Sequence, residues 1–175
     1  MWGLTLEPAL DRTDLLAEPV VAALRAWKGD GAFQVAAIDP DLADTAAFCE
    51  RYGVPLDASA NCVVVAGKRG GEVRLAACVV LATTRADVNG VVRRHLDARK
   101  ASFAPQDQAV AETSMEYGGI TPFGLPADWP VLVDGAVTAQ PYVVVGSGVR
   151  RSKLVVPGAA LAGIESAQVL PDLAR

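Results

Sequence analysis

The sequence predicts an α+β fold built around a mixed β-sheet. Short apolar runs that are typical of strands alternate along the chain with segments whose apolar residues have the spacing of amphipathic helices. Two β-rich runs, at residues 61–67 and 72–83, are separated only by the glycine-containing turn KRGG, which indicates an antiparallel hairpin. A sheet that holds a hairpin as well as strands separated by helices is mixed rather than purely parallel.

The first 55 residues predict a helix, a strand and a second helix. Residues 14–28 have a helical pattern that the glycines of GDG end, and its apolar side chains share one face: Val20, Val21, Leu24 and Trp27. Residues 33–39 (FQVAAID) predict a strand. Asp39 and Pro40 are a favourable cap and first-turn pair for a helix that runs to Tyr52. Its buried side is expected to comprise Leu42, Ala46 and Cys49.

The rest of the chain predicts further alternation of helices and strands. Helices are expected at 87–97, from Pro105 to about Tyr117, and as a short segment from Pro157. Strands are expected at 101–104, 130–134, 142–146, 153–156 and 167–170. The sequence has no internal repeat or linker, and 51% of its residues are hydrophobic, so residues 1–175 are expected to form one domain with a substantial core.

The composition predicts a cytoplasmic protein. No apolar run approaches the ~18 residues of a membrane helix, and the N-terminus has neither the basic start nor the long apolar stretch of an export signal. The cysteines Cys49, Cys62 and Cys78 lack CxxC or Cys/His spacing, so neither a disulfide framework nor a zinc site is predicted. Cys49 is interpreted as a small core residue, since nothing basic flanks it to activate the thiol.

The net charge is −4, so the protein as a whole has no electrostatic attraction to nucleic acid. Any nucleic-acid contact must therefore be local. Two basic clusters are candidates, and each is also compatible with an ordinary solvated face: RRHLDARK, with Arg93, Arg94, Arg99 and Lys100, and RRSK, with Arg150, Arg151 and Lys153. The single histidine, His95, lies among arginines and is interpreted as a surface residue rather than a general base.

The stretch MEYGGITPFGLP, residues 115–126, is the most constrained loop in the sequence. Gly118 and Gly119 permit backbone angles that are closed to other residues, and Pro122 fixes the chain direction. Such a loop can present backbone N–H groups to a small polar group or to a developing oxyanion. The same residues are also compatible with a helix C-cap followed by an ordinary turn.

This loop, together with PVLVDGAV and YVVVGSGVRRSKLVVPGAAL further on, resembles the YbaK/ProX family of aminoacyl-tRNA deacylases, which are related to the editing domain of prolyl-tRNA synthetase. The family loop reads approximately GGISPFG, and here it is GGITPFG. The resemblance is strongest over about residues 60–170. It implies an α+β domain whose mixed sheet closes towards a barrel.

The resemblance implies hydrolysis of the ester of a mischarged tRNA by a free-standing domain, in the service of translation fidelity and without a metal or a cofactor. The implied partners are the tRNA acceptor end, carrying the mismatched amino acid, and a synthetase. In this interpretation a substrate cradle is formed by Gly118, Gly119, Thr121, Pro122, Phe123 and Gly124. A second glycine-rich turn is expected to face the same cleft: Gly146, Ser147 and Gly148.

The sequence departs from the family at a lysine that serves the active site, because Asn61 stands in its place. Lys153 or Arg150 is expected to supply the positive charge from the second turn, with Asn61 orienting the terminal ribose. Two hypotheses follow. One is a divergent deacylase that uses these residues, with Arg93, Arg94, Arg99, Lys100, Arg150 and Arg151 contacting tRNA phosphates. The other is a non-catalytic relative that binds an aminoacyl group, an amino acid or a partner protein.

Overall fold

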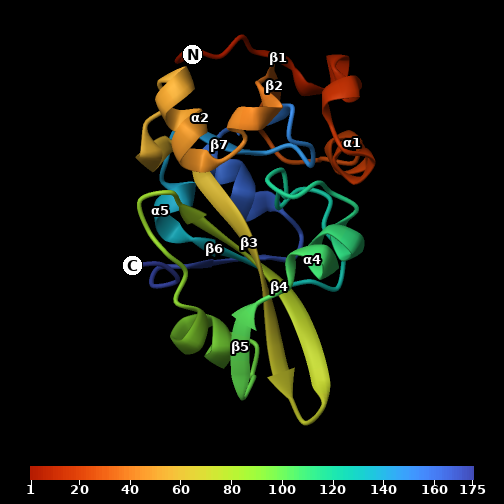
Figure 1. Cartoon of the computed structure of the whole chain (residues 1–175), viewed down its shortest axis with the longest axis vertical. Helices are drawn as coiled ribbons and strands as arrows, with labels where there is room; N and C mark the ends of the chain where they lie inside the picture. The colour runs from red at the N-terminus through yellow and green to blue at the C-terminus, as the bar shows by residue number, and fades with distance from the viewer.

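The chain forms two β-sheets, one of four strands and one of five, with short helices around them (Figure 1). The structure is a computed structural model and describes residues 1–175. The four-stranded sheet has the order β1-β2-β8-β7, and every neighbouring pair in it is antiparallel. Its strands are β1 (Glu7–Pro8), β2 (Gln34–Ala37), β7 (Val143–Gly146) and β8 (Ser152–Val156).

The five-stranded sheet has the order β5-β3-β4-β6-β9 and confirms the predicted mixed sheet. Its strands are β3 (Ala60–Arg69), β4 (Glu72–Leu81), β5 (Lys100–Phe103), β6 (Val131–Asp134) and β9 (Ala167–Leu170). The predicted hairpin is present as β3 and β4, which pair over their whole length. The pairs β4–β6 and β6–β9 are parallel.

The expected barrel is wrong, because the two sheets do not close into one. They are linked by a single isolated bridge between Ser59 and Val144. The outer edge of β3 is occupied from Val65 to Lys68 by β5, so only the beginning of β3 is left to approach β7. A cleft opens beside this junction.

The first two predicted helices are shorter than expected. α1 spans Glu18–Arg25 and follows a separate 3-10 turn at Thr13–Leu15, with Pro19 in the first turn of the helix. α2 spans Thr45–Tyr52, because Asp39 and Pro40 start only a 3-10 turn and the Asp44 side chain caps the helix itself by accepting from the N–H of Ala46. Phe48 and Cys49 are buried on α2, whereas Ala46 is exposed.

The later helices also differ in extent from the predictions. α4 spans Gln106–Thr113 and does not reach Tyr117, because Ser114 takes a left-handed conformation with φ of 56°. The segment predicted as a helix at 87–97 is a π-helical turn, η5 (Val88–Val92), followed by α3 (Arg93–His95). α5 (Gly135–Thr138) was not predicted. The remaining short turns are η1 (Ala9–Asp11), η4 (Leu56–Ala58) and η6 (Gly158–Gly163).

The core is divided between the two faces of the five-stranded sheet. The larger cluster has 22 buried residues, among them Val79, Phe123 and Leu154, and joins one face of this sheet to the four-stranded sheet and α1. A smaller cluster packs η5 and α3 on the other face through Val92 and Leu96. None of the helices has the length and apolar character needed to span a lipid bilayer.

Candidate active site

A cleft of about 410 Å³ opens where the two sheets meet. Its walls come from four parts of the chain: the first turn of α2, the beginning of β3, the loop around Gly118 and the facing ends of β7 and β8. We call this hollow the Lys153 cleft, because Lys153 has the most unusual environment of the residues that line it. The structure brings together here five of the residues predicted from the sequence: Asn61, Gly118, Gly146, Arg150 and Lys153.

Lys153 is a buried cation without an acidic partner. It lies in β8 and pairs in register with Gly146 of β7. Lys153 is only 8% exposed. Its Nζ donates to the carbonyl oxygens of Ala43 at 3.2 Å and Gly118 at 3.5 Å. It forms no ion pair, and Nζ lies 5.5 Å from the centre of the Phe48 ring.

Burial lowers the pKa of Lys153, because the interior solvates the charged ammonium less well than water does. The nearby charge of Arg150 acts in the same direction, and Asp44 opposes it. A buried charge that is not neutralised by a carboxylate destabilises the folded state. Ionisable groups in such a position, inside a cleft, are typical of functional sites.

Asn61 lies on the wall of the cleft near the start of β3, and its amide is oriented by Thr45. The Thr45 hydroxyl donates to Oδ1 of Asn61 at 2.7 Å. Since the amide oxygen is engaged, its NH₂ group is the part of Asn61 that remains to donate to a ligand. Thr45 was not predicted as a site residue, because a threonine in the first turn of a helix carries no sequence signal of its own.

The loop from Tyr117 to Ile120 forms the opposite wall. Gly118 has φ of +84°, a left-handed conformation that favours glycine. The N–H of Gly119 donates to the carbonyl of Glu116 at 2.9 Å and is therefore used inside the loop. The N–H groups of Gly118 and Ile120 make no hydrogen bond within the chain. Both residues line the cleft, so these two, rather than Gly119, are the loop N–H groups that are not already used inside the protein.

The two glycine-rich turns pack directly against each other. A Cβ at Gly146 would approach the carbonyl oxygen of Ile120 to 2.6 Å, and one at Gly119 would lie 2.7 Å from the backbone of Val149. The N–H of Gly148 donates to the carbonyl of Gly119 at 2.7 Å. Close backbone packing therefore fixes the loop relative to β7.

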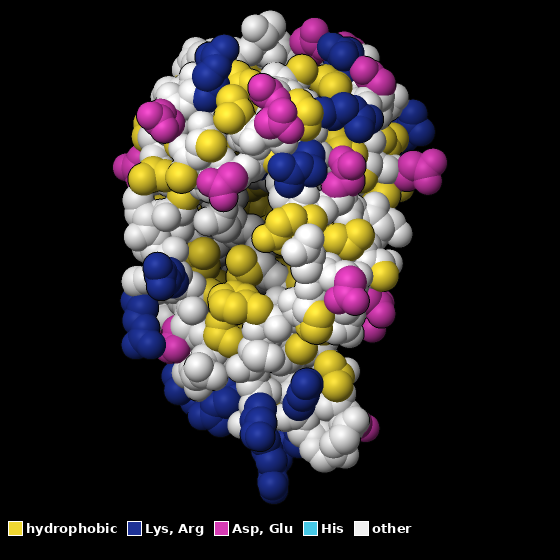
Figure 2. Space-filling view, in the orientation of Figure 1, with side chains coloured by type: hydrophobic (Ala, Val, Ile, Leu, Met, Phe, Trp, Pro, Cys, Tyr) yellow, Lys and Arg dark blue, Asp and Glu magenta, His cyan; other side chains and the backbone are white.

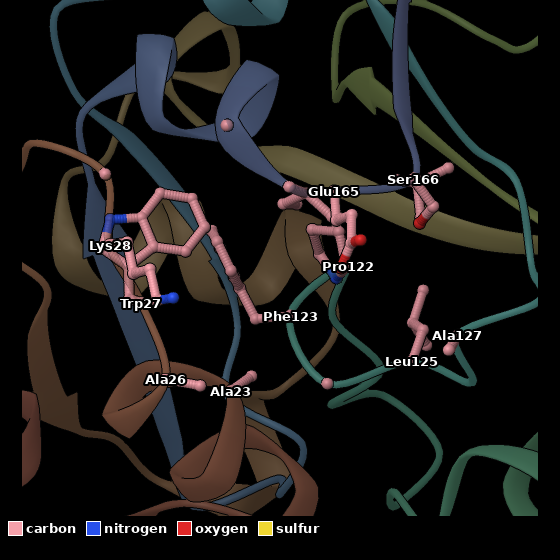
Figure 3. A pocket seen from close by; sticks show the side chains of 15 residues that line it. Ala23, Ala26, Trp27, Lys28, Pro122, Phe123, Leu125, Ala127, Glu165 and Ser166 are labelled. Atoms are coloured by element: carbon pink, nitrogen blue, oxygen red, sulfur yellow. The ribbon is translucent and has the colours of Figure 1, made fainter.

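Three of the predicted cradle residues lie on a different hollow. Pro122, Phe123 and Gly124 line a hollow of about 830 Å³ that does not include Lys153. Figure 3 shows Trp27 and Lys28 on one side of it and Leu125 and Ala127 on the other. The Phe123 ring packs edge-on against those of Trp27 and Phe33. Phe123 and Gly124 thus anchor the far end of the loop in the core instead of lining the Lys153 cleft.

Two other predicted residues, Thr121 and Ser147, do not line the cleft. Thr121 is fully buried, and its hydroxyl has no hydrogen-bond partner. Ser147 is also fully buried and shares a hydrogen bond of 2.7 Å with the hydroxyl of Ser152. Cys62 lines the cleft, but burial raises the pKa of its thiol, which disfavours the reactive thiolate. No three His, Cys, Asp or Glu side chains come together in the geometry of a metal site.

The predicted tRNA-binding cations lie in two places. Arg150 borders the cleft, and its guanidinium donates to the carbonyl oxygens of Tyr117 at 3.2 Å and Pro40 at 3.0 Å. Arg151 donates instead to the carbonyl of Asp14. The other four, which are Arg93, Arg94, Arg99 and Lys100, belong to α3, β5 and the turn between them.

The fold and the cleft define an α+β domain in which a constrained glycine loop faces a buried cation. Residues 39–164 match the model of the aminoacyl-tRNA editing domain family. Because the match covers well over half of the chain, the protein belongs to this family, and the resemblance noted from the loop is confirmed.

Solved structures with low sequence identity share the fold. The hypothetical protein APE2540 superposes with a TM-score of 0.72 at 18% identity, over 82% of this chain and 91% of that one. A protein proposed to be a trans-editing enzyme for prolyl-tRNA synthetase gives a TM-score of 0.69 at 18% identity, over 95% of this chain and 97% of that one. The comparison with curated protein sequences gave no match.

Proposed function

We propose that the protein is a trans-acting deacylase that hydrolyses the ester between a mismatched amino acid and the terminal ribose of a tRNA. Membership of the editing-domain family supports this class of reaction. The observation that carries the proposal for this chain is the environment of Lys153, a buried ammonium group that faces the cleft without a carboxylate to neutralise it. When water attacks an ester bound in the cleft, negative charge develops on the carbonyl oxygen, and this ammonium group then gains the anionic partner that it does not have in the free protein.

The proposed chemistry is the addition of water to the ester carbonyl carbon. The carbonyl oxygen becomes an oxyanion that the Lys153 ammonium and the N–H groups of Gly118 and Ile120 stabilise. When the tetrahedral intermediate collapses, the bond between the carbonyl carbon and the ribose oxygen breaks. The ribose oxygen takes up the proton that the attacking water loses, and the products are the free amino acid and the uncharged tRNA.

In this proposal Lys153 replaces the lysine that the family carries where this chain has Asn61. Both residues line the same cleft, Asn61 from β3 and Lys153 from β8. The charge is thus moved from the five-stranded to the four-stranded sheet. Asn61, held by Thr45, retains a neutral donor for a hydroxyl of the terminal ribose.

Arg150 is less suited than Lys153 to the oxyanion. Its guanidinium is already engaged with the carbonyl oxygens of Tyr117 and Pro40, where it ties the loop to the segment before α2. We therefore assign Lys153 the catalytic charge and Arg150 a position at the border of the cleft.

The test is the release of amino acid from a panel of mischarged tRNAs, with buffer alone as the reference. We expect the wild-type protein to accelerate release from at least one member of the panel and Lys153→Ala to lose this acceleration. If the protein accelerates none of them but binds a non-hydrolysable aminoacyl-tRNA amide, it is a binding protein and the deacylase proposal is wrong. If it neither hydrolyses nor binds any of them, the tRNA substrate is wrong as well.

A further inference from the structure

A second hollow, of about 490 Å³, continues from the Lys153 cleft along β3. It lies on the face of the five-stranded sheet that η5 and α3 cover only in part. Its floor is apolar, with Val63, Val80 and Val88, and Phe103 stands at its β5 side. Most of the rest of its lining is polar or charged: Thr84, Arg85, Asp87, Asn89 and Arg175. Arg175 forms an ion pair with Asp87 at 3.4 Å. We call it the Phe103 hollow.

The two hollows share Asn61 and Val63, so Asn61 lies at the junction between them. In an aminoacyl-tRNA the terminal ribose joins the acyl group to the adenine base. A substrate whose acyl carbonyl reaches Lys153 and whose ribose meets Asn61 therefore projects its base out of the Lys153 cleft. The Phe103 hollow is the adjoining space on the far side of Asn61.

Phe103 is an unusual surface residue for its size. It is 62% exposed, the highest value among the exposed large hydrophobic residues of the chain. β5 is an edge strand, and Phe103 pairs in register with the buried Val65 of β3. An aromatic ring that is exposed next to an apolar floor is the arrangement on which proteins stack a nucleobase.

The segment that contains β3, β4 and β5 is opposite in charge to the whole chain. Residues 60–104 contain eight basic residues (Lys and Arg) and three acidic residues (Asp and Glu), which gives a net charge of +5. The rest of the chain contains eight basic and seventeen acidic residues, which gives a net charge of −9. Figure 2 shows Lys and Arg side chains gathered at the end of the molecule that carries the turn between β3 and β4. Lys100 is in register with Lys68, and neither they nor the neighbouring Arg99 form an ion pair.

We propose that the Phe103 hollow receives the terminal adenine of the tRNA, stacked on Phe103, while the adjacent cations meet the phosphates that precede it. The proposal rests on the proposed function, because it takes aminoacyl-tRNA as the ligand. Asn89 gives the site a preference for adenine, since an asparagine amide offers the donor and acceptor that the N6 and N7 edge of adenine requires. The Asn89 side chain makes no hydrogen bond within the protein, whereas its main-chain carbonyl accepts from Arg93.

The experiment measures binding rather than hydrolysis. The probe is an adenosine that carries the amino acid as a 3′-amide, which cannot be hydrolysed as an ester, and the comparison probe is the same amide of cytidine. Phe103→Ala is expected to weaken binding of the adenosine probe by about tenfold or more. Tyr142→Ala removes another exposed aromatic residue, one that lines neither hollow, and is expected to leave binding unchanged. Asn89→Ala is expected to reduce the preference for adenosine over cytidine.

Equal binding of the adenosine probe by the wild-type protein and by Phe103→Ala overturns the inference. So does an absence of any preference for adenosine over cytidine in the wild type. If the wild type hydrolyses no mischarged tRNA but binds the adenosine probe through Phe103, the proposed function fails and the nucleotide site stands. If it hydrolyses them and Phe103→Ala does not affect binding, only the nucleotide site fails. All three substituted positions are exposed, and a thermal melt checks that each variant is folded.

Discussion

The hydroxyl of Thr45 donates a hydrogen bond to the amide oxygen of Asn61 at 2.7 Å. Thr45 opens α2 and Asn61 lies near the start of β3, so this bond connects two walls of the Lys153 cleft. It fixes which end of the amide is available to a ligand. Thr45 is therefore a positioning residue that acts through Asn61.

Thr45→Val is expected to lower kcat/KM for a mischarged tRNA by up to about tenfold, because a neutral hydrogen bond contributes roughly 1 kcal/mol. Valine keeps the branched shape and removes only the donor. Thr45→Ser restores the hydroxyl and is expected to restore most of the activity. Steady-state kinetics of the three proteins provide the measurement. If the serine and valine variants have the same activity, the hydrogen bond does not position Asn61.

Lys153→Met is expected to have opposite effects on activity and stability. Loss of the cation should reduce kcat/KM by about 100-fold or more, the usual effect of removing a donor to an oxyanion. The free energy of unfolding should rise by about 1 kcal/mol, because an unpaired buried charge is replaced by an apolar chain of similar length. The control is Arg25→Met, which removes an exposed cation from α1. Deacylation assays and denaturant titrations measure the two effects, and a Lys153→Met variant that remains fully active contradicts the mechanism.

The pH dependence follows from the lowered pKa of Lys153. The oxyanion is stabilised by the ammonium form, so enzyme-catalysed release should decline as the pH rises through a pKa that lies below the ordinary lysine value of 10.5. Lys153→Arg should lose this decline if it is active, because a guanidinium stays protonated. Spontaneous hydrolysis is subtracted at each pH. A wild-type profile that shows no alkaline decline would exclude the ammonium from the rate-determining step.

Stability should change with pH in the opposite direction. The unfolded chain binds the Lys153 proton more tightly than the folded one, so the free energy of unfolding should rise between the lowered folded pKa and 10.5. Below the folded pKa the full cost of the buried charge is present. The measurement is denaturant unfolding of the wild type and of Lys153→Met across this range. The difference between the two should shrink as the pH rises.

Gly118→Ala should impair deacylation, whereas Gly53→Ala should not. Both glycines have positive φ, +84° and +66°, so each alanine costs about 1–2 kcal/mol in backbone strain. A Cβ at Gly53 would meet no atom within 4 Å, while one at Gly118 would lie 2.6 Å from the guanidinium of Arg150. Comparable melting temperatures with activity lost only in Gly118→Ala would place the effect in the cleft. Equal activity of the two variants would remove the loop from the mechanism.

Local cations are expected to set the salt dependence of tRNA binding. Each phosphate contact contributes about 0.7–0.9 to the slope of log affinity against log salt concentration. Arg99→Ala/Lys100→Ala and Arg93→Ala/Arg94→Ala should lower this slope. Arg150→Ala/Arg151→Ala should lower it less, because both guanidinium groups donate to protein carbonyls. The measurement is binding of a non-hydrolysable aminoacyl-tRNA amide across a salt series, with Arg25→Ala as the control. An unchanged slope in all three double variants would show that these cations do not contact tRNA phosphates.

The sequence by itself determined the elements that depend on neighbouring residues. The β3–β4 hairpin was predictable because its turn and its two strands are contiguous in the chain. The constrained conformation of the glycine loop was predictable because glycine and proline act on the backbone locally, whereas its interpretation as a substrate cradle came from the family resemblance. Lys153 was identified as a candidate from its place next to the second glycine turn, but nothing in the sequence indicates that it is buried beside Phe48 and the Ala43 carbonyl.

The tertiary structure decided the features that depend on contacts between distant segments. α4 ends at Thr113 although the sequence pattern continues, and the N–H of Glu116 then donates to the carbonyl of Gly148 instead of continuing the helix. The two sheets do not close into a barrel: β5 pairs with β3 from Val65 to Lys68, and the sheets meet only through the bridge between Ser59 and Val144. The loop contributes Gly118 to one hollow and Phe123 to another because the packing of Gly119 against Val149 turns the chain between them. These outcomes depend on which distant backbones can approach each other, and local sequence patterns do not encode that.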